Sequence, residues 1–265
     1  MASNPSNPLT ASDLTDFIAA ESAFALEMAA LQALRTLGFD AEHAAAYVDP
    51  VTTKIRAYDI RARLVNAARS FRLAVECKNL QRTSPLLVHA TPRLPTEAYH
   101  TVVKHYRIGD HPFSRADKLR SKVYEAGVSV GRQTDQPTKD DKGKFKSSDG
   151  PTYEKWLQAV NGCLDLVQEL AAASHSETHF GVIVPFLVVP VNTLWQVDYD
   201  DDGTVVTQVR QVERATLILR HSWTAQISFS PLKYDISHLE IVALPALSQR
   251  VKDLTEAGGL LSDLR

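Results

Sequence analysis

The stretch Ser70-Phe71-Arg72-Leu73-Ala74-Val75-Glu76-Cys77-Lys78 decides how this chain is expected to fold and what it is expected to do. Its apolar residues predict a β-strand, in which successive side chains point to opposite faces. Glu76 and Lys78 therefore share one face of the strand. The other face carries Leu73, Val75 and Cys77. A carboxylate and an ammonium in so apolar a strand are costly to bury without partners or a metal, and such local conflicts are typical of functional sites.

The composition around this stretch is that of an ordinary globular protein. The 265 residues are 44% hydrophobic and 23% charged, which suffices for a substantial core. The net charge of −2 gives no overall nucleic-acid signature, so any contact with DNA must come from a local basic face. The two cysteines, Cys77 and Cys163, form neither a disulfide framework nor the paired spacing of a zinc site, and they fit a reducing cytoplasm.

The N-terminal residues carry no clear targeting signal. Residues 1–9 are polar and rich in Pro, Asn and Ser, so we expect them to be disordered. They lack the basic region and apolar run of a signal peptide. The longest apolar stretch, residues 180–191, is too short and too interrupted by proline to span a membrane as a helix. Residues 10–265 show no internal repeat and no convincing linker, so we expect a single cytoplasmic domain without membrane contact.

Hydrophobic spacing predicts a mixture of helices and strands, of α/β or α+β class. Apolar residues recur at helical spacing through residues 14–37, as one helix or two, and the run ends at Gly38. Strands are predicted at 55–65 and 71–77, and a strong helix at 153–173 precedes a buried strand at 180–191. The remaining expected elements are a short apolar segment at 85–89, a hairpin of 194–199 with 204–209, strands at 215–219 and 239–244, and a closing helix within 245–257.

The middle of the chain has the least regular pattern. Short helices are predicted near residues 96–103 and 114–126. Residues 133–150 are polar and are predicted to form a mobile loop or insertion. This segment contains Asp140-Asp141-Lys142, which repeats the acid-x-Lys spacing of Glu76 and Lys78. It has no apolar framing, so we interpret it as a solvated run of charges.

Asp59 supplies a second carboxylate close to Glu76 and Lys78. It lies in the preceding predicted strand, and the sixteen intervening residues fit two strands joined by a short hairpin. Two carboxylates on neighbouring strands suit Mg²⁺, a hard cation that prefers oxygen ligands. Such a metal lowers the pKa of a bound water and stabilises charge on a phosphate. A nearby lysine orients the attacking water or stabilises the developing negative charge.

The order of these motifs resembles the PD-(D/E)XK nuclease superfamily, and most of all its restriction-endonuclease-like, Mrr-type members. The shared order is an amphipathic helix ending in Gly-Phe at 38–39, Tyr-x-Asp-Pro at 47–50, Arg-x-x-Asp-Ile at 56–60, and Val-Glu-Cys-Lys at 75–78. The resemblance covers residues 20–90. It implies a restriction-endonuclease-like αβββαβ core, with a mixed central β-sheet flanked by helices. The helix at 153–173 and the strand at 180–191 would complete this core, and a C-terminal β-rich extension would follow it.

The resemblance also implies roles for individual residues. Asp59 and Glu76 would bind Mg²⁺, for which Mn²⁺ can substitute, and Lys78 would assist the attacking water. Such nucleases often place a further Glu on the first helix to complete the metal site. Glu27 is the best match for that residue, ahead of Glu21.

Three further positions bear on the resemblance. Gln158 corresponds to the polar helix residue that often faces the site in this family. Tyr58 stands in place of the Pro that names the motif, and Ala57 stands where an acid after the Arg is typical. We therefore expect Asp59, Glu76, Lys78 and Glu27 to be catalytic, with Gln158 as a weaker nucleic-acid contact.

The expected function is that of a Mg²⁺-dependent nuclease that hydrolyses phosphodiester bonds, with DNA as its substrate and an endonuclease mode of cleavage. The chain shows no sequence-reading domain, so a homodimer or a partner subunit would supply targeting, as in a defence or restriction system. Lys118, Arg120 and Lys122 could line a DNA groove or form the solvated face of a helix.

Simpler interpretations stay open beside this hypothesis. Glu76 and Lys78 could lie on the wet face of a half-exposed strand, as is common in antiparallel sheets. Glu27 could be an exposed helix carboxylate. The same fold could also serve as a catalytically idle module that binds nucleic acid or a protein partner, which the near-neutral charge and the polar insertion favour.

Overall fold

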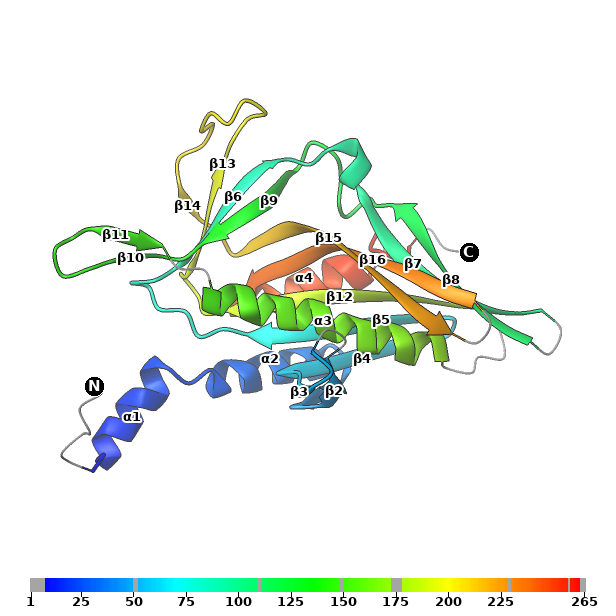
Figure 1. Cartoon of the computed structure of the whole chain (residues 1–265), viewed down its shortest axis with the longest axis horizontal. Helices are drawn as coiled ribbons and strands as arrows, with labels where there is room; N and C mark the ends of the chain where they lie inside the picture. Colours follow the sequence, from blue (N-terminus) through cyan, green and yellow to red (C-terminus); the bar gives the residue numbers. More distant parts are fainter. Residues whose placement is uncertain are drawn as a thin grey trace.

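The computed structural model describes residues 8–49, 52–108, 111–147, 150–172, 178–227, 230–256 and 258–262. Residues 1–7, on which most of the expected N-terminal disorder falls, lie outside these ranges. Within the described ranges the protein is a mixed α/β structure with a large central sheet and four α-helices (Figure 1).

One end of the sheet consists of a short edge strand that is not predicted from the sequence and three strands at predicted positions. They lie in the order β1 (Asp40–His43), β4 (Ile60–Asn66), β5 (Arg69–Cys77) and β12 (His179–Val189). The first three are antiparallel neighbours, whereas β5 and β12 are parallel. Parallel neighbours need a long crossover connection, and this crossover includes the helix α3 (Gly150–Ala172).

Each face of this central sheet carries its own hydrophobic core. Helix α3 covers one face of β5 and β12, while α2 (Phe24–Thr36) and α4 (Leu247–Thr255) lie on the opposite side (Figure 1). As the alternation predicts, Leu73, Val75 and Cys77 belong to the core beneath α2 and α4, whereas Ala74 belongs to the core beneath α3. In chain order these elements are α2, β1, β4, β5, α3 and β12, and the described residues add a small hairpin between β1 and β4 and six further strands between β5 and α3.

The N-terminal helical run is two helices. Helix α1 (Ala11–Ala20) begins at a capping box formed by Thr10 and Asp13 and has no buried residue. In Figure 1 it projects away from the sheet. Among the described residues, no single helix has the length and apolar character to cross a membrane. The α1–α2 pair reaches that length and composition only across a bend of 50°.

The sheet continues beyond β12 into strands from the second half of the chain and the middle. In order they are β16 (Ser230–Ala243), β15 (Arg214–Ile227), β9 (Ser129–Asp135), β6 (Leu86–Pro92), β13 (Leu194–Asp198) and β14 (Arg210–Gln211). A long hairpin of β7 (Tyr99–Ile108) and β8 (His111–Arg120) pairs with the beginning of β12. Two small hairpins stand apart from this sheet, namely β2 (Ala46–Val48) with β3 (Ile55–Ala57), and β10 (Pro137–Lys139) with β11 (Phe145–Ser147).

The predictions for the middle of the chain need correction. Residues 96–103 and 114–126 are not helices, because β7 and β8 occupy most of both segments, with a short 3₁₀ turn at Pro95–Glu97. The run Thr101-Val102-Val103 has strand-favouring side chains, and all three are buried against the rest of the sheet. The predicted loop at 133–150 contains the end of β9 and the β10–β11 hairpin. Long-range pairing therefore overrides the weak local pattern.

Candidate functional site

Asp59 and Glu76 converge where β4 begins beside the end of β5. Strand register pairs Ile60 with Val75, so Asp59, in the bend directly before β4 and not within the predicted strand, lies at the level of Glu76 on β5. The Asp59 amide N–H donates to Glu76 Oε1 at 3.4 Å, and the Cys77 amide donates to Asp59 Oδ2 at 2.8 Å. Glu76 is 0% exposed, so the interpretation of Glu76 as a residue on a wet strand face is wrong.

The cation that joins these two carboxylates is Lys155, from the second turn of α3. Its Nζ lies 2.9 and 2.8 Å from the two carboxylate oxygens of Asp59 and 2.9 Å from Glu76 Oε2. A buried carboxylate needs such a partner, because an isolated buried charge is very costly. Sequence reasoning missed Lys155, although it lies three residues before Gln158 and so on the same helix face.

Tyr58 explains how α3 comes close enough for this contact. Its hydroxyl donates to the Gly162 carbonyl at 2.7 Å, and a Cβ on Gly162 would lie 2.3 Å from a carbon of the Tyr58 ring. Only a glycine allows the helix to approach the ring this closely. Tyr58, which stands where the PD-(D/E)XK motif has its Pro, therefore holds α3 close to the beginning of β4.

The pKa of Glu76 is raised toward neutral pH. Burial raises the pKa of Glu76, the charge of Asp59 raises it further, and the Lys155 ammonium partly opposes both, which leaves a pKa of about 8. Burial lowers the pKa of Lys155, but the attraction of Glu76 and Asp59 outweighs it and holds that pKa above its ordinary value. Lys155 is therefore a permanent cation, while Glu76 exchanges a proton in the physiological range.

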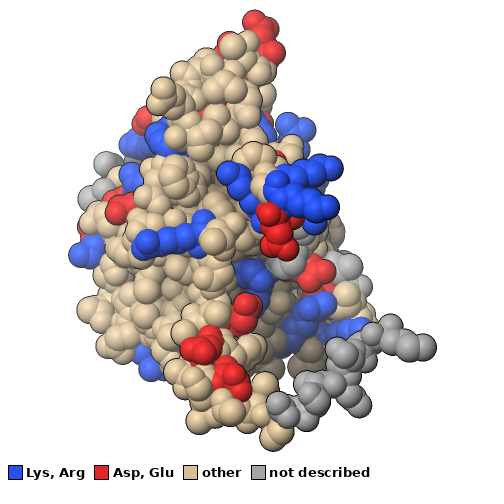
Figure 2. Space-filling view, turned by 90° about the vertical axis from the view of Figure 1, so that its left-hand side faces the viewer, with Lys and Arg blue, Asp and Glu red and all other residues tan. Residues whose placement is uncertain are grey.

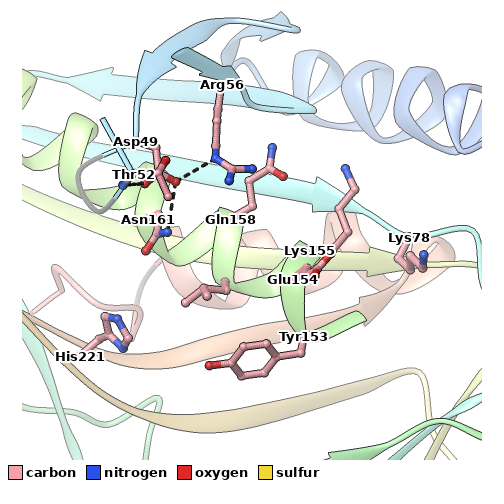
Figure 3. A pocket seen from close by; sticks show the side chains of 11 residues that line it. Asp49, Thr52, Arg56, Lys78, Tyr153, Glu154, Lys155, Gln158, Asn161 and His221 are labelled. Carbon is pink, nitrogen blue, oxygen red and sulfur yellow. Dashed lines mark hydrogen bonds and ion pairs between the residues drawn. The ribbon is translucent and has the colours of Figure 1, made fainter. Parts of the chain in front are cut away.

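Lys78 lies beyond the end of β5 and lines an open cleft of about 720 Å³ (Figure 3). Its backbone N–H donates to the Val188 carbonyl at 2.9 Å, which continues the pairing of β5 with β12. Lys155 also lines this cleft, whereas neither Asp59 nor Glu76 does. Lys155 therefore lies between the cleft and the two carboxylates.

Glu27 has a different partner from the one that the family resemblance implies. Its carboxylate lies 2.8 Å from Nε2 of His43 on β1. It is close enough to contribute, after burial and Asp59, to the raised pKa of the Cys77 thiol. Across the described ranges, no three His, Cys, Asp or Glu side chains form a group that could hold a metal ion. The structure thus brings Asp59 and Glu76 together and leaves Glu27 paired with His43.

The wall of the cleft contains a second polar cluster, around Asp49 of the predicted turn. Asp49 is 1% exposed and accepts from Arg56 Nε at 3.0 Å, from the Thr52 amide at 2.8 Å and from Asn161 Nδ2 at 3.3 Å (Figure 3). Gln158 lines the same cleft, as predicted for a residue facing the site, and its amide donates to the Ala57 carbonyl at 2.7 Å. These bonds fix the β2–β3 hairpin against α3.

The predicted basic cluster does not join this site. Lys118 and Arg120 lie on β8, not on a helix face, and Lys122 follows that strand. Lys118 pairs with Asp235 at 2.6 Å. The β7–β8 hairpin meets β12 at Gly181, six residues before the level of Glu76, which is about 20 Å along a strand.

The second acid-x-Lys motif has the surroundings that we expect of a solvated charge run. Asp140-Asp141-Lys142 forms the turn between β10 and β11, away from any apolar strand. Asp141 and Lys142 are exposed.

Comparisons with protein-family models, with curated proteins and with solved structures find no match for this chain. The site is therefore defined by its own geometry, in which two carboxylates surround one cation beside a cleft. The cleft lining combines the basic residues Arg56 and Lys78 with the acidic residues Asp49 and Glu154. Carboxylate oxygens are able to bind a cation, and the basic side chains are able to bind an anion.

Proposed function

We propose that this protein is a divalent-metal-dependent nuclease with a restriction-endonuclease-like core. The observation that carries the proposal is the convergence of Asp59, in the bend before β4, and Glu76, on β5, on a single cation beside a cleft that Lys78 lines. The order of α2, β1, β4, β5, α3 and β12 supports the same conclusion, because it follows the αβββαβ order of that core once β2–β3 and β6–β11 are treated as insertions.

The residues at this position fit a hard divalent cation. The carboxylate oxygens of Asp59 and Glu76 are suitable ligands, and the Lys155 ammonium at 2.8 to 2.9 Å already occupies a position between them that favours positive charge. Mg²⁺ is usually held by only one or two carboxylates and retains several waters, so this pair suffices. A metal bound there would supply an activated water and stabilise charge on a phosphate.

Lys155 must move aside before a metal can occupy this position, because two cations repel each other at so short a distance. Its side chain already lines the cleft, so the displaced ammonium remains available to an anionic substrate. Glu76 must also be ionised, and its pKa of about 8 means that the ionised fraction rises from neutral to alkaline pH.

The cleft has the chemistry of a polynucleotide site. Lys78 and Arg56 reach it from different strands and offer cations to phosphates, and the Asp49 ion pair orients the Arg56 guanidinium. Tyr153, in the first turns of α3, is exposed at the cleft and offers an aromatic face to a base. In this proposal Lys78 stabilises negative charge on the reacting phosphate or orients the water.

The decisive test is cleavage of plasmid and of single-stranded DNA in Mg²⁺ or Mn²⁺. We expect the wild type to cleave and the Lys78→Ala, Asp59→Asn and Glu76→Gln variants to lose at least a hundredfold in rate. Asp201→Asn is the control, because it removes an exposed carboxylate from a turn whose residues do not line the cleft. Equal rates in wild type and Lys78→Ala would contradict the proposal.

A catalytically idle module that binds nucleic acid or a partner protein is the second candidate. It is favoured by Lys155, which satisfies both carboxylates without a metal. Titration calorimetry with Mg²⁺ separates the two functions. Binding of Mg²⁺ to the wild type that is lost in Asp59→Asn supports the nuclease. Absence of Mg²⁺ binding in both the wild type and Asp59→Asn supports the idle module.

A further inference from the structure

We infer that the β10–β11 hairpin is a nucleic-acid-binding arm beside the cleft. The inference rests on the proposed function, since it names a further contact for the same substrate. Residues 137–147 contain four lysines and two aspartates, which gives this short segment a net charge of +2 in a chain whose net charge is −2. A local basic surface of this kind is what an overall acidic protein needs to bind a polyanion.

The turn at the tip of the hairpin has a defined structure that presents its lysines. Asp140 Oδ1 accepts from the backbone amides of Lys142 and Lys144 at 3.0 Å each, and Gly143 has the positive φ of 74° that the turn requires. Asp140 thus directs one carboxylate oxygen to the backbone, and its other oxygen lies 3.8 Å from the Lys146 ammonium. The basic side chains of the hairpin are exposed, and they are Lys139, Lys142, Lys144 and Lys146.

One face of the hairpin combines an aromatic ring with a cation. Lys139 pairs with Phe145 in the strand register, and the Lys139 ammonium lies 4.9 Å from the centre of the Phe145 ring. Phe145 is 68% exposed, so most of its ring surface is open to a ligand. Exposed aromatic rings next to cations are the usual platform on which bases of an unpaired strand stack.

The base of the hairpin is fastened next to the cleft. Thr152 in α3 donates its hydroxyl to Gln136 Oε1 at 2.8 Å, and the Gln136 amide donates to the Ser84 hydroxyl at 2.9 Å. Tyr153, the residue after Thr152, lines the cleft. The hairpin projects from this end of the sheet in Figure 1, and Figure 2 faces that end and shows basic side chains there beside acidic ones. A strand held by the hairpin would therefore pass the entrance of the cleft.

A nucleic acid suits this surface better than an acidic protein does. Lysines alone would serve either partner, but the exposed Phe145 adds a stacking surface that every base can use and that a carboxylate-rich surface does not need. Lys118 of the β7–β8 hairpin is a weaker candidate for the same task, because its ammonium is engaged by Asp235.

The test measures binding without cleavage, by fluorescence anisotropy of a labelled unpaired oligonucleotide in EDTA over a series of salt concentrations. The arm variant carries Gln at Lys139, Lys142, Lys144 and Lys146. The control variant removes four exposed cations elsewhere, by Gln at Arg69, Arg214, Lys233 and Lys252. We expect the arm variant to lower the slope of log affinity against log salt by about 3, and the control variant to leave it close to wild type.

Phe145→Ala tests the stacking face separately and is expected to weaken binding about tenfold with the salt slope unchanged. Thermal unfolding of each variant shows that the fold is kept. The inference is overturned if wild type does not bind the oligonucleotide, if arm and control variants bind alike, or if a polyglutamate peptide binds the arm more tightly than the oligonucleotide.

The two proposals fail in distinguishable ways. Binding that depends on the arm, in a protein that never cleaves in Mg²⁺ or Mn²⁺, keeps the arm and rejects the nuclease. Cleavage by the wild type that the arm variant matches in rate and in substrate affinity keeps the nuclease and rejects the arm.

Discussion

Glu76 makes the stability of the protein depend on pH at the scale of one residue. Its pKa of about 8 in the folded protein lies above its ordinary value of 4.5, with burial as the main cause. Between these two values the folded state binds more protons than the unfolded state, so the contribution of Glu76 to stability is full below pH 4.5 and is lost as the pH rises through 8.

The Glu76→Gln variant isolates this effect, because glutamine has a similar shape and cannot ionise. We expect the difference in Tm between variant and wild type to shift in favour of the variant as the pH rises from about 5 to about 8. Thermal unfolding followed by circular dichroism over that range measures it. A difference that stays constant with pH would show that Glu76 ionises in the folded protein as it does in the unfolded chain.

Lys155 is the second residue whose replacement is informative. Lys155→Met keeps much of the side-chain volume but leaves Asp59 and Glu76 without their cation, and we expect a loss of about 2 kcal/mol in the free energy of unfolding. If the carboxylates accept a divalent metal, Mg²⁺ should raise the Tm of this variant more than that of wild type.

Lys252→Met serves as the control for the Lys155 experiment, since Lys252 is an exposed residue of α4 on the other face of the sheet. A Tm of Lys155→Met that does not respond to Mg²⁺ or Mn²⁺ would argue that the two carboxylates hold only the ammonium.

At the scale of an element, the position of α3 depends on one glycine. In an ordinary helix interior, Gly→Ala gains about 1 kcal/mol. At Gly162 the new Cβ would lie 2.3 Å from the buried Tyr58 ring, and relieving such overpacking typically costs 1 to 3 kcal/mol. We therefore expect Gly162→Ala to lower the free energy of unfolding by about 1 kcal/mol and to move α3 away from Asp59.

Gly150→Ala is the matched control on the same helix, because a Cβ there meets no atom within 4 Å. Urea unfolding compares the two variants. Stabilisation by both substitutions would mean that the contact between Gly162 and Tyr58 does not set the position of the helix.

In contrast to a change in the position of α3, removal of the α1 helix is expected to have little effect on stability. It has no buried residue, and its end is held by hydrogen bonds from Asn79 to the carbonyls of Ala20 and Ser22. Truncation tolerance follows from burial and hydrogen bonding, so removal of residues 1–20 should change the free energy of unfolding by less than about 1 kcal/mol. A larger drop in the urea midpoint would show that α1 packs against the rest of the protein.

At the scale of the whole molecule, basic and acidic side chains are distributed so that no broad face is basic in the view of Figure 2. A protein of net charge −2 must then bind a polyanion through small local surfaces. The cleft walls and the β10–β11 hairpin are two such surfaces at one end of the central sheet, where β5 and α3 bring Glu76 and Lys155 together.

Much of the local structure follows from the sequence by itself. The alternation around Glu76 separates its face from that of Leu73 and Val75, and the spacing to Asp59 predicts two adjacent strands that bring the carboxylates together. The strong pattern of residues 153–173 predicts α3. These features depend on neighbours within about twenty residues, where side-chain direction follows from the period of a strand or a helix.

Only the tertiary structure determines which of those elements contact each other, and through which residues. Lys155 and Glu76 are 79 residues apart, and their contact exists because Gly162 lets α3 lie against Tyr58. The same is true of β7, which pairs with β12 and with β8 where the sequence has a weak helical pattern, and of Glu27, which binds His43. Residue periodicity specifies which face a side chain takes, but the partner on that face depends on packing between segments that are remote in the chain.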